Sequence, residues 1–118
     1  MIYYFSGTGN SRFIAREIAT LTNDTALDIA ATQTAPPDEN RAFLGIVFPV
    51  YGWQPPKIVR RFCNTLNRAA ASGRFVYAIL TCGTDCGKTL KILRRLMLLR
   101  GIGIDSAYSV IMPDVYVC

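Results

Sequence analysis

The 118-residue sequence predicts an α/β protein in which helices cover both faces of a parallel sheet. Short β-branched, aromatic or wholly apolar runs alternate with segments long enough for a helix. In those longer segments the apolar residues recur at the spacing of one helix face. Glycine, proline or small polar residues stand at most of the boundaries. This alternation is typical of strand–helix–strand units with parallel strands and right-handed crossovers.

The first half of the chain predicts two strands and one amphipathic helix. A strand is expected over Ile2–Phe5, which is β-branched and aromatic and ends in a Ser/Gly turn. A helix is expected from Asn10 to Leu21, where Ile14 and Ile18 lie at helical spacing. The second strand is predicted over Ala26–Ala30. Residues 31–41 contain two adjacent prolines and many polar groups, so they predict a surface connection.

The middle of the chain predicts the centre of the sheet. Phe43–Val50 is almost wholly apolar, as expected for a parallel strand buried on both faces. Two prolines, Pro55 and Pro56, open a helix that is expected to close near Gly73. Phe75–Leu80 then predicts a fourth buried strand.

The last third predicts one long helix and a fifth strand. Thr84 or Asp85 can cap the helix, which is expected to end at Gly101. Its expected apolar stripe consists of Leu90, Ile92, Leu93, Leu96, Met97 and Leu99. The fifth strand is predicted over Ala107–Met112.

Composition indicates one globular domain over residues 1–118, because 51% of the residues are hydrophobic and the mean hydropathy is +0.24. No apolar run approaches the roughly 18 residues of a membrane span, and no basic leader precedes the first strand, so we expect a cytoplasmic protein. The four cysteines form no CxxC pair and the chain has no histidine, which gives no zinc or thioredoxin motif. Reduced thiols are therefore expected.

Positive charge is concentrated in the second half. The net charge is +5, and most of the 13 Lys and Arg residues fall within residues 55–100, whose only acid is Asp85. Such a field would attract an acidic protein or nucleic acid. A solvated helix face is the commoner meaning of such charge, so no nucleic-acid partner is expected.

The loop after the first strand has the composition of a phosphate site. It consists of Ser6, Gly7, Thr8, Gly9, Asn10 and Ser11. Its glycines let backbone N–H groups turn inward, and hydroxyl and amide groups surround a helix N-terminus, which favours an anion. A capped glycine-rich turn is the simpler alternative. Spacing and content favour phosphate.

Other phosphate-binding motifs do not match this loop. A Walker A loop would need Gly-Lys followed by Ser or Thr, where Asn10, Ser11 and Arg12 stand. A dinucleotide fingerprint would need a third glycine at Arg12, and Asp28 is only a weak candidate for its ribose acid. A low-molecular-weight phosphatase would need a cysteine in the loop.

Two further loops follow the third and fourth strands. The first contains Pro49, Val50, Tyr51, Gly52 and Trp53. Its aromatics could cover a planar heterocycle, although packing against neighbouring loops is an equal alternative for each alone. The pairing with a phosphate loop favours a ring site. A receiver domain would need an acid near Pro49.

The loop after the fourth strand contains Thr81, Cys82, Gly83, Asp85, Cys86 and Gly87. Its glycines would let backbone amides approach the edge of the same ring, and Asp85 would place negative charge beside it. The C-x3-C spacing does not guarantee a disulfide or a metal site, so buried or inert thiols are expected at Cys82 and Cys86.

These pieces together resemble a known family. The stretches Ile2–Ala15, Phe48–Pro56, Leu80–Gly87 and Val110–Tyr116 are similar to the flavodoxin-like domain of bacterial fused flavodoxin/ferredoxin proteins. The resemblance implies an open five-stranded sheet of order 2-1-3-4-5. Flavodoxin is itself a standard example of ligand binding where strand order reverses, so this placement comes from the resemblance.

The resemblance also implies a function. Flavin mononucleotide (FMN) would bind non-covalently, with its phosphate in the Ser6–Ser11 loop and its ring against the loops Pro49–Trp53 and Thr81–Gly87. The flavin would carry electrons to or from iron–sulfur or flavoprotein partners, ferredoxin-like or acidic ones among them. Related chains continue into a final helix that this sequence lacks. We therefore expect a homo-oligomer or a further C-terminal segment to cover the sheet face left bare.

Two other functions remain open. An FMN-dependent NAD(P)H:acceptor reductase of the quinone type would keep the cofactor, but the sequence has no second nucleotide fingerprint. A flavin-free binding module would use the basic helices alone.

Overall fold

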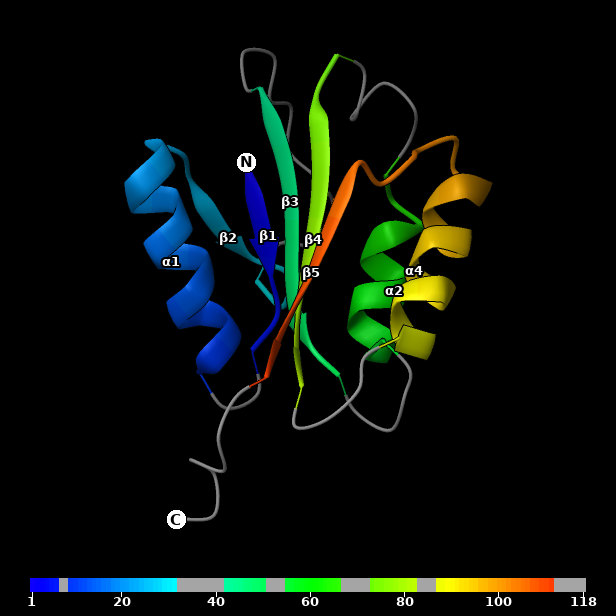
Figure 1. The fold of residues 1–118 in the computed structure, drawn as a ribbon, viewed down its shortest axis with the longest axis horizontal. Helices are drawn as coiled ribbons and strands as arrows, with labels where there is room; N and C mark the ends of the chain where they lie inside the picture. The colour runs from blue at the N-terminus through cyan, green and yellow to red at the C-terminus, as the bar shows by residue number, and fades with distance from the viewer. Residues whose placement is uncertain (7–8, 32–41, 51–54, 67–72, 83–86, 112–118) are drawn as a thin grey trace.

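The computed structural model describes residues 1–6, 9–31, 42–50, 55–66, 73–82 and 87–111. They form a parallel five-stranded sheet of order β2-β1-β3-β4-β5, set between two helical layers (Figure 1). The strands are β1 Ile2–Tyr4, β2 Ala26–Asp28, β3 Phe43–Pro49, β4 Phe75–Cys82 and β5 Ser106–Ile111. The helices are α1 Asn10–Thr22, α2 Lys57–Cys63 and α4 Gly87–Leu99. The predicted sheet, its strand order and the helices on both faces are confirmed.

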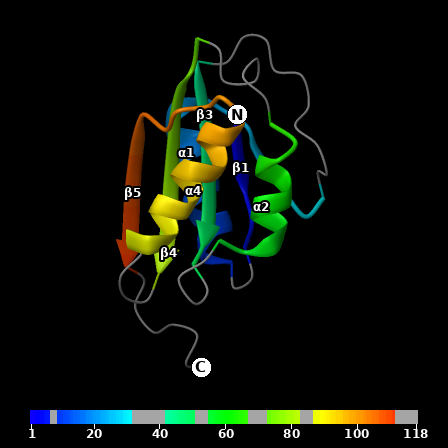
Figure 2. The same ribbon diagram turned by 90° about the vertical axis from the view of Figure 1, so that its right-hand side faces the viewer.

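The helices divide unequally between the faces. Figures 1 and 2 show α1 on one face, with α2 and α4 side by side on the other. No helix within the described ranges is long and apolar enough to cross a membrane.

The second helix is shorter than predicted. It ends at Cys63 instead of near Gly73. After Asn64, the N–H groups of Thr65 and Leu66 bond to the carbonyls three residues before them, which is no longer the helical pattern. The Thr65 hydroxyl donates to the Phe62 carbonyl over 2.6 Å, a local bond that competes with helix continuation. Leu66 nevertheless stays fully buried, as its spacing predicted.

Alternate residues of the central strands face opposite helical layers, which is why these strands are almost wholly apolar. Leu44, Ile46 and Phe48 of β3 pack in a core cluster with residues of α2 and α4, among them Phe62 and Leu93. Ile2, Tyr4, Val47 and Ile79 form the second cluster, with Ala15 and Ala19 of α1.

The face carrying α1 is covered incompletely. Phe43 and Phe75 are 43% and 44% exposed, and Tyr108 of β5 is 56% exposed. Their registers place all three on the α1 side of the sheet, since Tyr108 pairs with Ile79 and Phe43 pairs with Phe75. The prediction of a bare sheet face therefore holds only for these three residues, since Ile2, Val47 and Ile79 on the same side are buried.

Gly45 in β3 makes room for an aromatic ring from the neighbouring strand. It pairs with Tyr77 of β4, and a Cβ added to Gly45 would overlap the Tyr77 ring. The glycine therefore leaves room for the Tyr77 ring to lie over β3, where the Tyr77 side chain is largely buried.

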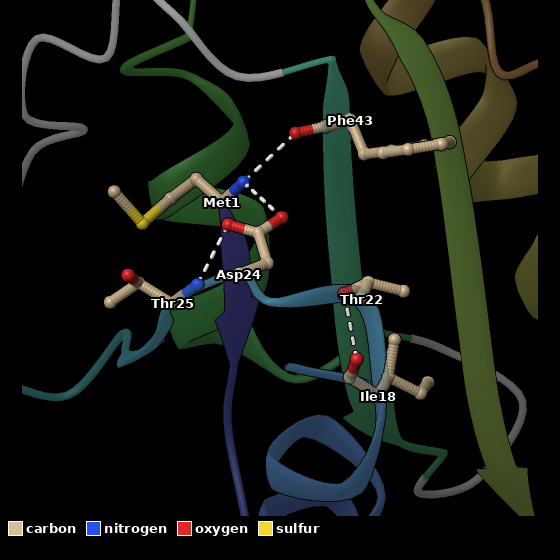
Figure 3. A network of polar contacts seen from close by, with 6 residues as sticks. All are labelled: Met1, Ile18, Thr22, Asp24, Thr25 and Phe43. Carbon is tan, nitrogen blue, oxygen red and sulfur yellow. Dashed lines mark hydrogen bonds and ion pairs between the residues drawn. The ribbon is translucent and has the colours of Figure 1, made fainter. Parts of the chain in front are cut away.

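A polar network holds together the amino end of the sheet (Figure 3). The α-ammonium group of Met1 donates to Asp24 Oδ2 over 2.7 Å and to the Phe43 carbonyl over 2.9 Å. Asp24 Oδ1 also accepts the Thr25 N–H over 2.7 Å. These bonds connect the turn after α1 to the beginnings of β1 and β3.

Candidate functional site

The three predicted ligand loops leave the sheet at one edge. The Ser6–Ser11, Pro49–Trp53 and Thr81–Gly87 segments lie at the carboxyl ends of β1, β3 and β4. Pro49 is the last residue of β3, and Thr81 and Cys82 are the last two of β4. Strand order reverses between β1 and β3, because β2 lies on one side of β1 and β3 on the other. Ligands of open parallel sheets bind at such a point. The predicted site residues Gly7, Thr8, Tyr51, Gly52, Trp53, Gly83, Asp85 and Cys86 lie outside the described residues.

The partial positive charge at the N-terminus of α1 is not offset by an acidic residue in the first turn of the helix. No side chain caps it, and its first turn contains no acid, while Arg12 in that turn is exposed. The first N–H groups of a helix have no acceptor within it and carry partial positive charge. Asn10, Ser11 and Arg12 therefore present donors toward this edge with a cation beside them. An anion would satisfy this arrangement.

Two loop residues shape the entry to α1. Gly9 has φ 98° and ψ −14°, and its carbonyl accepts the Phe13 N–H over 3.0 Å. A Cβ at Gly9 would meet no atom within 4 Å, so the positive φ and not lack of space requires glycine. The Gly9 N–H donates to Ser6 Oγ over 2.8 Å, which leaves the Ser6 hydroxyl proton available.

Ser11 and Thr81 join the first loop to the third. Their hydroxyl oxygens lie 3.2 Å apart in a hydrogen bond, and the residues are only 1% and 4% exposed. The Thr81 carbonyl accepts the Val50 N–H over 2.9 Å. Thr81 therefore ties the ends of β3 and β4 to the first turn of α1. Both are predicted site residues, and the structure brings their side chains together in a hydrogen bond to each other.

Asp28, the weak candidate for a ribose acid, ends β2 at the same edge. Its Oδ1 accepts the Ala30 N–H over 2.9 Å, and its carbonyl accepts the Ala31 N–H. The carboxylate thus closes the turn after β2, which is why that strand stops short of Ala30.

Thr89 is a polar residue that the sequence analysis missed. It lies in the first turn of α4, which begins at Gly87, and it is fully buried with no hydrogen-bond partner for its hydroxyl among the described residues. Its position four residues before Leu93 was the available signal, because that spacing places it on the buried helix stripe. Buried hydroxyls usually have a hydrogen-bond partner, so Thr89 is an exception, and it lies near the carboxyl ends of the strands.

The structure describes two of the four cysteines, Cys63 and Cys82, and one of them differs from expectation. Cys63 is free and buried, as predicted, and burial raises the pKa of its thiol to about 12. Cys82 is disulfide-bonded, so the expected reduced thiol at this position is wrong. Disulfide formation depends on two Cβ atoms lying about 4 Å apart, a tertiary relation that arguments from cellular compartment do not address.

Known structures share this fold. The solution structure of two-electron reduced Megasphaera elsdenii flavodoxin matches with TM-score 0.71 and 19% identity, over 97% of this chain and 89% of that chain. A Lactobacillus acidophilus flavoprotein in complex with FMN matches with TM-score 0.67 and 12% identity, over 92% and 90% of the two chains. Fusobacterium nucleatum flavodoxin bound to FMN matches with TM-score 0.65 and 16% identity, over 96% and 77%.

No protein-family model matches the chain, and no curated protein is significantly similar to it. At these identities the structural matches establish a flavodoxin-like fold.

Proposed function

We propose that this chain binds FMN non-covalently and transfers electrons through the flavin. The observation that carries the proposal is the uncapped, acid-free N-terminus of α1 at the point where strand order reverses. Three solved structures with this fold are flavodoxins or flavoproteins, and two of them hold FMN.

The described residues fit the phosphate of FMN. The N–H groups of Asn10, Ser11 and Arg12 are the donors, and the Ser6 hydroxyl adds another. The exposed Arg12 guanidinium adds charge that favours a phosphate dianion. Gly7 and Thr8 complete the proposed phosphate loop.

The isoalloxazine ring would lie against the two neighbouring loops, with Pro49–Trp53 on one side and Thr81–Gly87 on the other. The bonds from Thr81 to Ser11 and Val50 support this placement, because they keep the origins of the three loops together. The bound flavin would supply the ability to accept and release electrons.

Iron–sulfur or flavoprotein partners are the proposed donors and acceptors, including ferredoxin-like modules such as those fused to the family that the sequence resembles. The bare part of the α1 face, around Phe75 and Tyr108, would be covered by a second copy or by a C-terminal segment of a longer natural protein. Light scattering over a concentration series tests the second copy. A protein that stays monomeric at every concentration would exclude self-association.

Titration with FMN and with riboflavin tests the cofactor assignment. FMN should bind at least tenfold more tightly, because the first turn of α1 contains no acid that could take the place of the phosphate. Equal affinities would contradict the phosphate assignment.

Gly9→Ala should weaken FMN binding, and Gly73→Ala is its matched control. Both glycines have positive φ, 98° and 73°, and neither would place a Cβ within 4 Å of another atom. Both variants carry backbone strain of about 1 kcal/mol or more. Gly73, however, precedes β4 at the amino ends of the strands, opposite the candidate site. Equal loss of FMN affinity in both would show that Gly9 acts through stability alone.

The reductase alternative predicts steady oxidation of NADH or NADPH with a quinone acceptor. The electron-transfer proposal predicts flavin reduction only through a protein partner or a chemical reductant. Multiple turnovers with nicotinamide alone as donor would replace the proposal by the reductase.

A further inference from the structure

The outward side of α4 is basic and partly apolar. Its exposed residues, which we call the α4 outer face, are Lys88, Lys91, Arg94, Arg95, Leu98 and Leu99. The two leucines are 64% and 76% exposed. Single exposed leucines are common, but two adjacent ones beside cations form a surface with both charge and apolar area.

This positive charge is not balanced nearby within the described residues. Neither α4 nor α2 contains an acid, and α2 adds the exposed cations Lys57 and Arg61 in the same layer (Figure 2). Lys91 and Arg95 make no hydrogen bond or ion pair with the described part of the chain.

The described acids have other positions or partners. Asp24 binds the Met1 ammonium group, Asp28 closes a turn, and Asp105 accepts the Val76 N–H over 2.7 Å. Glu17 lies on α1, across the sheet. The α4 outer face therefore presents a local positive field.

The α4 outer face includes an open groove of about 420 Å³. The groove is lined by Lys88, Lys91, Ile92, Arg95, Leu96 and Leu99. Ile92 and Leu96 are half-buried, so the groove combines apolar surface with cations. A protruding apolar side chain flanked by carboxylates would match both features.

The groove extends from the candidate site. Lys88 follows Gly87 at the carboxyl edge of the sheet, and Leu99 lies at the other end of a helix that is about 20 Å long. A partner lying along α4 would thus have one end beside the proposed flavin.

We propose that the α4 outer face docks an acidic protein that exchanges electrons with this chain. Carboxylates of the partner pair with Lys91 and Arg95, and an apolar side chain packs between these cations and Leu99. The redox role of the partner rests on the proposed function, whereas the docking does not.

Two other anionic surfaces fit less well. A membrane-surface helix buries a wide apolar face in lipid, but α4 turns Leu93 and Met97 into the protein core. Single-stranded nucleic acid is usually held by aromatic stacking, and α4 contains no aromatic residue.

Fluorescence anisotropy with a labelled acidic bacterial ferredoxin tests the docking, with or without flavin. Lys91→Glu combined with Arg95→Glu should weaken binding about tenfold, and an ionic strength of about 0.15 M should weaken the wild type more than this variant. Arg16→Glu, an exposed charge reversal on α1, is the control and should change affinity less than about twofold.

A second matched pair tests the apolar contact. Leu99→Ser should weaken binding about fivefold, whereas Leu21→Ser on α1, where Leu21 is 82% exposed, should not.

An equal effect per reversed charge in Arg16→Glu and in the Lys91→Glu, Arg95→Glu double variant would overturn the proposal, since net charge alone would then explain binding. No binding of the ferredoxin at low salt would also overturn it. Tighter binding to phosphatidylglycerol vesicles or to an oligothymidylate, lost in the same double variant, would reassign the face to membrane or nucleic acid. A protein that docks the ferredoxin but binds no FMN would refute only the proposed function.

Discussion

Helices α1 and α4 have the same length but pack in different ways. Each has 13 residues and buries every fourth residue against its own face of the sheet. On α1 these buried residues are Ser11, Ala15 and Ala19, and on α4 they are Thr89, Leu93 and Met97. The small residues let α1 pack closely against β1 and β3, so that many Cα atoms of the helix and these strands lie within 8 Å of each other. The larger residues of α4 keep that helix at a greater distance from the strands.

The difference in packing gives the two helices different roles. The close packing of α1 holds a helix N-terminus at the edge between β1 and β3, where an anion site needs fixed geometry. The larger residues of α4 supply core volume, and its outward side carries cations and leucines instead of a mixture of charges. The following changes test this division, from the largest expected effect to the smallest.

Leu93→Ala should have the largest effect on stability. It removes a fully buried side chain from the core cluster of α2 and α4 and leaves a cavity, which costs about 3 kcal/mol. Urea unfolding measures the change. Leu98→Ala, at a residue 64% exposed on the same helix, should change stability by less than about 0.5 kcal/mol. Similar losses in the two variants would mean that α4 does not pack as described.

Ala15→Leu should cost about 2 kcal/mol and should also weaken FMN binding. Ala15 is fully buried under α1, so the added atoms must push the helix away from the sheet. Urea unfolding and FMN titration under native conditions measure the two effects. The control, Phe13→Leu, changes a residue 63% exposed on α1. Unchanged FMN affinity in folded Ala15→Leu would separate helix packing from the phosphate site.

Alkaline pH should destabilise both faces of the sheet. Burial raises the pKa of Cys63, on the α2 and α4 side, from 9.0 to about 12. Burial, and then the charge of Asp24, raise the pKa of Tyr77, on the α1 side, from 10.0 to about 12. Because the folded state holds these protons more tightly, their contribution is complete below the unfolded pKa values. It is lost as pH rises toward 12.

The expected slope is about 1.4 kcal/mol per pH unit for each group. Cys63→Ala should move the onset of the loss from about pH 9 to about pH 10, and Tyr77→Phe should reduce the slope above pH 10. Urea midpoints between pH 8 and 11 measure both effects. A flat stability profile in the wild type would show that neither group is desolvated.

The smallest expected effects come from the two buried hydroxyls, and they should have opposite signs. Ser11→Ala leaves the Thr81 hydroxyl without the Ser11 partner and should cost about 1 kcal/mol. Thr89→Val removes a buried hydroxyl that has no partner in the part of the chain that the structure describes, and should stabilise by about 1 kcal/mol. Thermal unfolding without ligand compares them. Destabilisation by Thr89→Val would indicate that its hydroxyl has a partner in solution.

Much of the fold could be predicted from sequence because each element carries its own signal. The continuous apolar run at Phe43–Val50 indicated a strand buried on both faces, and the observed strand, Phe43–Pro49, is buried from Leu44 onward. The apolar spacing placed α1 within one residue of its observed end. Helix ends set by local hydrogen bonds were harder, as the early end of α2 at Thr65 shows.

The apolar spacing also failed on the outward side of α4. It assigned Leu99 to the buried stripe, but Leu99 is 76% exposed. Spacing gives the side of a helix on which a residue lies. Burial also requires that another element packs against the helix at that position along its axis.

By itself the sequence determined the parallel α/β class, the sites of the strands and a glycine-rich loop before a helix, which we propose as the phosphate site. These depend on spacing and backbone preference within a few residues. Tertiary structure decided that Ser11 pairs with Thr81 and that Gly45 accommodates Tyr77. Such relations join residues far apart in the chain, and no local pattern records which side chains will meet across a sheet.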